Sequence, residues 1–248
     1  MDGFNAISSV AQNIYFWITF CVAIGVLYAR LMKRAKAPKT ISEYINRIDG
    51  DQNRATRKII AYMSCVIVDD KPEDFPVDFM KNFFKSLSIE EKISLNDVGR
   101  ISAHDIIFLD VADVVSEDLK RGGAILISRL REVKPEAIIV SVSSKKYDVE
   151  VTDYFAMADL TMRKPIRAAT IEEQLVAHFN KKIGPHALAK EIDMTIDRVV
   201  GPGKLKSFAR YFESASKGRK PIISDVVRRA GIESRCNRLV SQIKLLQQ

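Results

Sequence analysis

The sequence has few of the residues that usually form disulfides or metal sites. Its 248 residues include three cysteines and three histidines. The cysteines form no CxxC pair and are Cys21, Cys65 and Cys236. An odd number at such spacings argues against a disulfide framework and a zinc site, and it suits a reducing compartment. The histidines, none at metal-ligand spacing from another, are His104, His178 and His186. We expect them to be structural or surface residues.

Other absences narrow the possible functions. The sequence has no internal repeat, no low-complexity tract and no glycine-rich nucleotide loop. It also lacks kinase and cyclase signatures, so it does not indicate an enzymatic output domain. A hydrophobic content of 47% and a charged content of 28% are typical of globular proteins.

Positive charge is concentrated toward the C-terminus. The net charge is +8, and residues 186–248 hold 13 Lys and Arg against 6 Asp and Glu. A basic region of this kind indicates binding to an anionic lipid surface, a nucleic acid or an acidic partner. A solvated helical surface would have the same composition, so the sequence leaves these alternatives open.

Residues 14–29 form an uncharged apolar run, IYFWITFCVAIGVLYA. A cleaved signal peptide would need basic residues before the run, and a buried core helix is a second alternative. The pattern favours a transmembrane helix over about residues 14–32. Basic residues follow it directly, at Arg30, Lys33, Arg34, Lys36 and Lys39. By the positive-inside rule we expect a single-pass protein of the bacterial inner membrane, with the bulk of the chain in the cytoplasm.

The chain divides into four parts by pattern. Residues 1–34 form the N-terminal segment, and residues 35–61 read as a juxtamembrane connector with a short helix near 41–48. Residues 62–183 alternate apolar runs with helical periods. Residues 184–248 are basic and helical only, with expected helices at 187–200, 205–216, 222–230 and 235–246.

The alternating part predicts an α/β fold with a doubly wound, parallel sheet. The expected strands are residues 65–69, 92–96, 106–110, 137–142 and 159–162. Several are nearly continuous in Val, Ile and Leu, as parallel strands covered on both faces should be. The expected helices between and after them are residues 76–87, 119–133, 149–157 and 170–182.

Polar side chains gather where these strands end. Asp69 and Asp70 end the first strand, Asp110 ends the third, and Lys164 follows the fifth. Ser141 and Ser143 lie at the end of the fourth. Open parallel sheets place functional groups at the carboxyl ends of their strands. The aspartates can hold a hard cation such as Mg²⁺, and a carboxylate can also be a nucleophile in phosphoryl transfer.

These motifs resemble the receiver domain of two-component response regulators over about residues 62–179. The matching stretches are VIVDDK (66–71), DIIFLD (105–110), IIVSVS (138–143) and MRKPI (162–166). The resemblance implies a five-stranded sheet in the order 2-1-3-4-5. It implies that Asp69 and Asp70 are the acidic pair that binds Mg²⁺ together with Asp110, and that Asp110 is the phosphoacceptor. Lys164 would be the invariant lysine, before a commonly cis proline.

The resemblance also places Ser141 or Ser143 at the switch hydroxyl position. It implies a histidine kinase or phosphotransfer protein as partner, and no enzymatic activity beyond self-phosphorylation and dephosphorylation at Asp110. The sequence departs from the family where no Met-Pro follows Asp110, where residues 97–104 are too short for a full second helix, and where Thr161 replaces the switch aromatic. A non-catalytic scaffold that recruits partners at the membrane is therefore the alternative.

The C-terminal helices allow more than one function. Residues 222–246 are compatible with a helix-turn-helix, but their apolar spacing also suits a plain helical bundle. We expect a bundle that docks a partner or self-associates, with contact to a lipid surface as a further possibility. Nucleic-acid binding is the least favoured of these, because a membrane tether makes access to a chromosome harder.

Overall fold

The computed structural model describes residues 37–110, 112–119, 121–144, 156–218 and 230–248, together with residues 19, 20, 22, 24–27, 227 and 228. The expected helix at 149–157 lies almost entirely outside these residues, and so does most of the one at 222–230.

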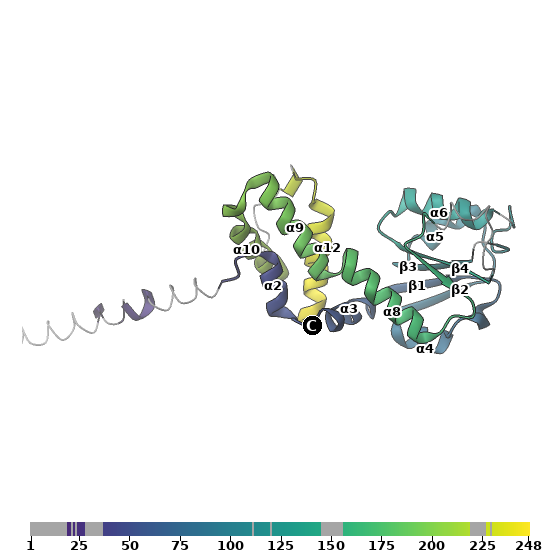
Figure 1. Ribbon diagram of the computed structural model, residues 1–248, viewed down its shortest axis with the longest axis horizontal. Coiled ribbons are helices and arrows are strands. Elements are labelled where there is room, and N and C mark those ends of the chain that lie inside the picture. The colour runs from purple at the N-terminus through teal and green to yellow at the C-terminus, as the bar shows by residue number, and fades with distance from the viewer. Residues whose placement is uncertain are drawn as a thin grey trace, which may run out of the picture.

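A five-stranded, fully parallel sheet forms one lobe of the molecule (Figure 1). Its strands are β1 (Ser64–Val68), β2 (Ser86–Glu90), β3 (Ile106–Asp110), β4 (Ile138–Ser143) and β5 (Leu160–Arg163). Their order is β2-β1-β3-β4-β5, which confirms the predicted order and the α/β fold class. The apolar side chains of β1, β3 and β4 are almost all fully buried, because helices cover both faces.

The prediction for the second strand is wrong. Residues 92–96 form a loop and the start of a 3₁₀ turn, η2 (Leu95–Asp97), whereas the strand is β2. The expected helix at 76–87 is correspondingly shorter, since α4 (Val77–Phe83) ends before Phe84 takes an extended conformation. β2 is an edge strand with the sequence SLSIE and is only partly buried. It therefore lacks the continuous apolar run that marks the central strands.

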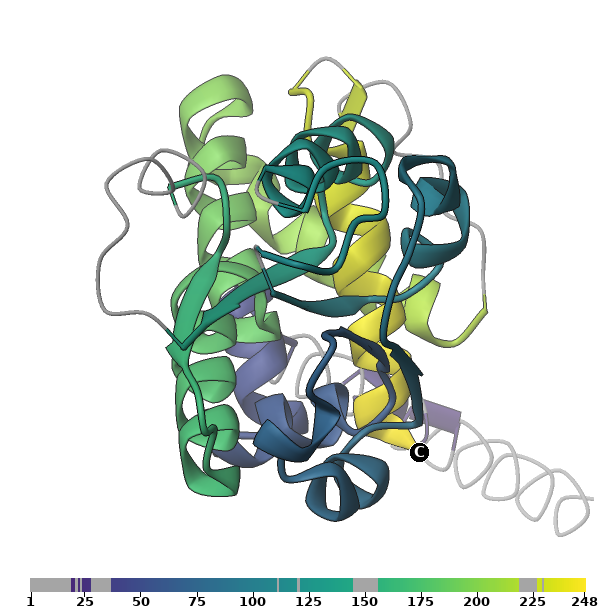
Figure 2. The same cartoon turned by 90° about the vertical axis from the view of Figure 1, so that its right-hand side faces the viewer.

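Helices cover the two faces of the sheet (Figure 2). On one face, α3 (Gln52–Ile60), α4 and α8 (Ala168–His178) pack over Ile67, Phe108 and Val140. On the other face, α5 (Val98–Ile101) and α6 (Gly122–Val133) pack over Val66 and Ile107. The four-residue α5 agrees with the expectation that the second helix is not full length. The sheet is thus doubly wound, as predicted.

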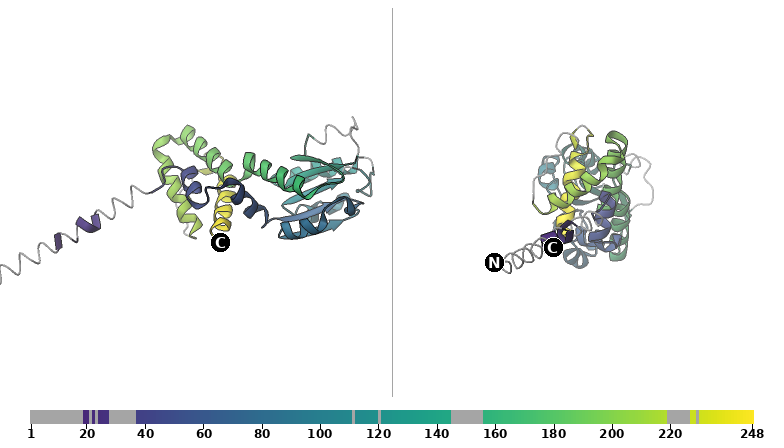
Figure 3. Two further views of the ribbon diagram at one scale, coloured as in Figure 1. Left: turned by 60° about the horizontal axis from the view of Figure 1, so that its bottom comes forward. Right: turned by 90° about the vertical axis from the view of Figure 1, so that its left-hand side faces the viewer.

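A second lobe is entirely helical and has its own core (Figure 3). It contains α2 (Ile41–Ile48), α9 (Pro185–Val200), α10 (Leu205–Ser216) and α12 (Glu233–Gln247), with the short 3₁₀ turn η5 (Pro202–Lys204) between α9 and α10. The expected helix at 41–48 therefore packs against the C-terminal helices. Asp193 of α9 fixes it there by accepting hydrogen bonds of 2.9 Å from the backbone N–H groups of Ile41 and Ser42.

The two lobes are joined by nearly continuous helix. After α8, residues Phe179–Ile183 form one π-helical turn (η4), and α9 begins at Pro185. Polar side chains of α3 bind this wider turn: Gln52 donates to the carbonyl of Asn180 at 3.1 Å, and Thr56 lies 2.6 Å from the Asn180 side chain. Helix α3, which the sequence analysis did not expect, thus secures the junction.

The prediction of a membrane-spanning helix at 14–32 needs correction. Among the residues that the structure describes, none belongs to a helix with both the length and the apolar character that a membrane crossing requires. Within this stretch the described helical residues are 19, 20, 22 and 24–27. The predicted single-pass inner-membrane location is therefore wrong. The rest of the stretch, residues 14–18 and 28–32 included, lies outside the described residues.

Candidate functional site

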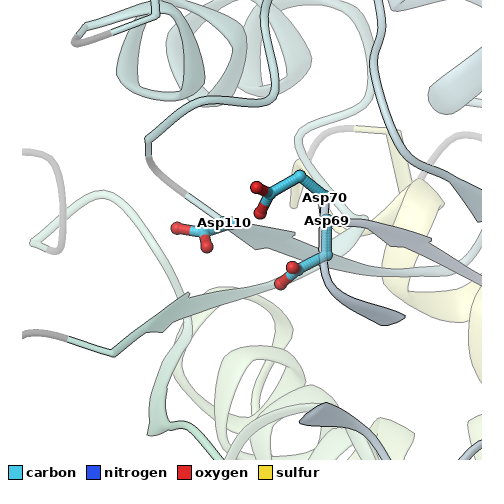
Figure 4. A group of neighbouring side chains, drawn as sticks. All are labelled: Asp69, Asp70 and Asp110. Carbon is cyan, nitrogen blue, oxygen red and sulfur yellow. The ribbon is translucent and has the colours of Figure 1, made fainter. Parts of the chain in front are cut away.

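Three carboxylates and one ammonium group meet at the carboxyl end of the sheet. Asp69 and Asp70 follow β1, Asp110 is the last residue of β3, and Lys164 follows β5. Figure 4 shows the three carboxylates turned toward one another. The sequence predicted these four residues as a group, and the structure brings them together.

The alternation of side chains along the strands explains this convergence. The residues two positions earlier on the three strands all pack into the core beneath α4 and α8: Ile67, Phe108 and Met162. Side chains at i and i+2 of a strand share a face, so Asp69, Asp110 and Lys164 continue that apolar face past the edge of the sheet. The site is therefore the polar end of an otherwise apolar row.

Lys164 forms ion pairs with two of the aspartates. Its Nζ donates to Asp69 Oδ1 at 2.6 Å and to Asp110 Oδ2 at 2.5 Å. The lysine side chain is 4% exposed, Asp69 is fully buried, and Asp110 is 13% exposed. The Lys164–Pro165 peptide is cis, as the resemblance implied. The ion pairs partly offset the free-energy cost of taking two charged carboxylates out of water.

Burial and pairing shift the pKa values in this group. Burial raises the pKa of Asp69, although the hydrogen bonds from Lys164 and from the Lys71 N–H oppose this shift. For Lys164, burial acts to lower the pKa, but the hydrogen bonds to Asp110 and Asp69 outweigh it and the pKa is raised. Lys164 is thus charged at neutral pH, while Asp69 is the carboxyl group whose charge is opposed by its surroundings.

The donor set fits a hard divalent cation such as Mg²⁺. One oxygen from each of Asp69, Asp70 and Asp110 lies within 4.8 Å of the other two. Asp69 Oδ2 is buried and accepts no hydrogen bond, even though Lys164 Nζ is 2.6 Å away. Three carboxylates against one ammonium leave an excess of negative charge, and carboxylate oxygens are ligands that Mg²⁺ prefers. The exposed Asp70 leaves an entry from solvent.

The structure does not bring Ser141 to this group. Ser141 is fully buried, donates to the carbonyl of Leu160 at 3.2 Å and lies 3.0 Å from Thr161 Oγ1. It shares a face of β4 with Ile139, which packs beneath α6, and alternation puts Ser143 on that same side. The carbonyl of Ser143 accepts a hydrogen bond of 3.1 Å from the Lys164 N–H.

Val142 is the β4 residue that lies beside Asp110. The two are register partners in the sheet, and Val142 is fully buried in the same core as Phe108. Partners on neighbouring strands point to the same face, so the β4 side chain next to Asp110 is aliphatic. The sequence analysis missed this residue. The alternation of apolar Ile138, Val140 and Val142 in the run IIVSVS was the available indication.

Comparisons with known proteins give structural neighbours only. No protein-family model and no curated protein matches the chain. The BeF3-activated DrrB receiver domain is 15% identical, with a TM-score of 0.39, and the match covers 48% of this chain and 97% of that one. A CheY-like receiver domain protein from Methanospirillum hungatei is 15% identical, with a TM-score of 0.38 and coverage of 49% and 99%.

A third neighbour covers more of the chain. RcsB from Salmonella enterica serovar Typhimurium, bound to promoter rprA in the presence of phosphomimetic BeF3, is 11% identical over 75% of this chain and 87% of that one, with a TM-score of 0.37. Scores this low support no inference about function. The strand order and the placement of Asp69, Asp70, Asp110 and Lys164 stand on the chain's own geometry.

Proposed function

We propose that this protein is a receiver-like signalling protein that accepts a phosphoryl group on Asp110 and binds Mg²⁺ through Asp69, Asp70 and Asp110. The observation that supports this most directly is the convergence of the three carboxylates with Lys164 at one sheet edge. A lone acidic pair at a strand end would be an ordinary turn or helix cap. A buried lysine bound to two of three clustered carboxylates is not explained by capping.

Each residue has a role in the proposed reaction. An oxygen of Asp110 attacks the phosphorus of a phosphohistidine, the P–O bond forms as the P–N bond breaks, and the departing imidazole takes up a proton. Lys164 Nζ, now paired with Asp110, can follow the charge onto a phosphoryl oxygen. Asp69 keeps Lys164 in place. Bound Mg²⁺ would supply positive charge that offsets the charge of the phosphoryl oxygens.

The proposed donor is a histidine kinase or phosphotransfer protein, and the helical lobe is the proposed output. Helices α9, α10 and α12 carry seven basic residues of this lobe. We propose that this lobe docks a protein partner or a second copy. Apart from the phosphoryl chemistry at Asp110, we propose no catalytic activity.

Acetyl phosphate, a small phosphodonor, tests the proposal. With Mg²⁺, the full-length protein should gain one hydroxylamine-sensitive phosphate, and EDTA should prevent this. Asp110→Asn should abolish the modification. Asp78→Asn, at an exposed position of α4, is the matched control and should keep it. Failure of the folded wild-type protein to take up phosphate, or a phosphate that survives Asp110→Asn, would contradict the proposal.

A non-catalytic scaffold is the second candidate, and Val142 is the observation that favours it. An aliphatic side chain beside Asp110 cannot donate a hydrogen bond to a phosphoryl oxygen, and Ser141 is bound to Leu160 and Thr161 instead. This candidate predicts that partners co-purified with the tagged protein are the same for wild type and Asp110→Asn. A partner that is lost from Asp110→Asn but kept by Asp78→Asn would rule out the scaffold.

A further inference from the structure

The loop that follows Asp110 is fastened to the loop that follows β2. Residues 112–119 lie between β3 and α6, and residues 91–97 lie between β2 and α5. Ile93 and Val115 form a parallel bridge between the two loops. The N–H of Ile93 donates to the carbonyl of Val114, and the N–H of Ser116 donates to the carbonyl of Ile93, both at 2.9 Å. We call residues 93–95 and 112–119 the clamp.

A carboxylate and three apolar side chains strengthen the clamp. Glu117 accepts hydrogen bonds from the Leu95 N–H at 3.0 Å and from the Ser94 hydroxyl. The Ser94 bond is the largest cause of a lowered pKa for Glu117, so the carboxylate stays charged at neutral pH. Three residues of the clamp are buried in the core beneath α5 and α6: Ile93, Val114 and Val115.

The clamp is also closely fitted against α6. A Cβ added to Gly122, the first residue of α6, would lie 2.3 Å from Val115 Cβ, so this position has room only for glycine. Asp113 has a φ of 64°, which places a non-glycine residue in the left-handed region, and its N–H donates to the carbonyl of Leu119 at 2.7 Å. The loop is therefore held in one conformation by backbone and packing contacts together.

The clamp lies beyond the carboxyl end of β1. β1 lies between β2 and β3 in the sheet, so a direct pairing of their two following loops can form only beyond the end of β1. Asp69 and Asp70 lie at that end. The Ala112 N–H donates to Asp110 Oδ1 at 3.2 Å, which ties the clamp to the candidate phosphoacceptor itself. A change of charge or ligand at Asp110 therefore acts directly on this loop.

In the opposite direction, Asp110 is joined to the segment after β5 by its 2.5 Å ion pair with Lys164. Its neighbour on β4 is Val142, and the hydroxyls of Ser141 and Thr161 are bound to each other on the other side of the strand. A change at Asp110 could be transmitted through a β4 hydroxyl only if a hydrogen-bond donor stood at the position of the aliphatic Val142.

We propose that the clamp is the element that reports the state of the acidic site, carrying a change at Asp110 through Ala112 and the Ile93–Val115 bridge to the β2–α5 loop and α5. This inference rests on the proposed function, since it assigns the read-out of the same site. Occupation of the site tightens the clamp, because the oxygens of a phosphoryl group on Asp110 attract the Ala112 N–H that now faces the Asp110 carboxylate. Linkage then requires that loosening the clamp weakens ligand binding.

Hydrogen exchange read by mass spectrometry tests the inference, with Mg²⁺ plus beryllofluoride as the probe. In the wild-type protein, exchange should slow in peptides covering 91–97 and 112–119 and change less in peptides covering 138–143 and 160–166. Glu117→Gln should weaken Mg²⁺ binding about 5-fold. Glu132→Gln, at an exposed position of α6, is the matched control and should leave both results unchanged.

The outcomes separate this inference from the proposed function. If ligand binds and needs Asp110, but exchange in the clamp does not change and Glu117→Gln binds Mg²⁺ like Glu132→Gln, the inference is wrong and the proposed function stands. If no ligand binds the folded wild-type protein, the proposed function fails. The clamp can still be tested without ligand, by comparing hydrogen exchange at residues 112–119 in Asp110→Asn and in the wild-type protein. The inference requires a difference, and identical exchange in the two proteins overturns it as well.

Discussion

Removing the charge of Lys164 should destabilise the sheet lobe more than any surface charge change. In Lys164→Met, the fully buried Asp69 and the 13% exposed Asp110 lose their shared cation. Breaking a buried ion pair by removing one partner costs about 3 to 5 kcal/mol. Because Asp110 keeps some contact with water, we expect a loss near the lower limit, about 3 kcal/mol of unfolding free energy.

Urea unfolding followed by circular dichroism, in EDTA and then in Mg²⁺, would measure this loss. The loss should be greatest in EDTA and smaller with Mg²⁺, which can replace part of the missing positive charge. Lys85→Met, an exposed lysine after α4, is the control and should change stability by less than about 0.5 kcal/mol. Because protonation neutralises the unpaired carboxylates, the deficit of Lys164→Met should narrow as the pH falls below neutrality.

Two results would refute this reasoning. A loss for Lys164→Met no larger than that for Lys85→Met would mean that the ion pairs stabilise nothing. A loss that is independent of pH would mean that it comes from packing of the lysine stem and not from the carboxylates. Lys164→Met combined with Asp69→Asn separates the two causes further, since removing the buried charge should recover part of the stability.

Other regions allow independent predictions. Gly122→Ala should cost about 1 to 3 kcal/mol because its Cβ meets Val115, whereas Gly99→Ala in α5, with open space around it, should be neutral in the same urea assay. Burial lowers the pKa of His178, so the protein should lose stability as the pH falls through about 6.5, and His178→Gln should flatten that loss in Tm-versus-pH profiles. Burial raises the pKa of Asp69, so Mg²⁺ affinity measured by calorimetry should decline toward acid at a higher pH than for an ordinary aspartate.

The central strands and the acidic group could be predicted from the sequence. β1, β3 and β4 are short apolar runs that end in polar residues, and such runs are typical of strands buried on both faces. Because all strands of the sheet are parallel, residues at their carboxyl ends had to meet, and Asp69, Asp110 and Lys164 do so. These features depend on local patterns and one topological rule.

Features that depend on pairing between distant segments could not be predicted in this way. β2 is an edge strand of mixed burial, so its sequence resembles a loop as much as a strand. The location of Ser141 depended on which face of β4 meets Asp110, and a shift of one residue exchanges the two faces. The apolar residues of α2 gave no indication that their partners lie in α9, α10 and α12.

The helical lobe is built from segments that lie before and after the sheet in the sequence, and this order has a consequence for synthesis. The hydrogen bond between Ile41 and Asp193 joins residues that are 152 positions apart, and that between Gln247 and Tyr44 spans 203. At a ribosomal rate of about 5 to 20 residues per second, α2 waits roughly 8 to 30 seconds for α9 to be made. The sheet, encoded within that interval, can fold first and bring the two segments together. The helical lobe is then closed by a folded insert and not by a long flexible loop, so damage to the sheet core should also delay assembly of the helical lobe.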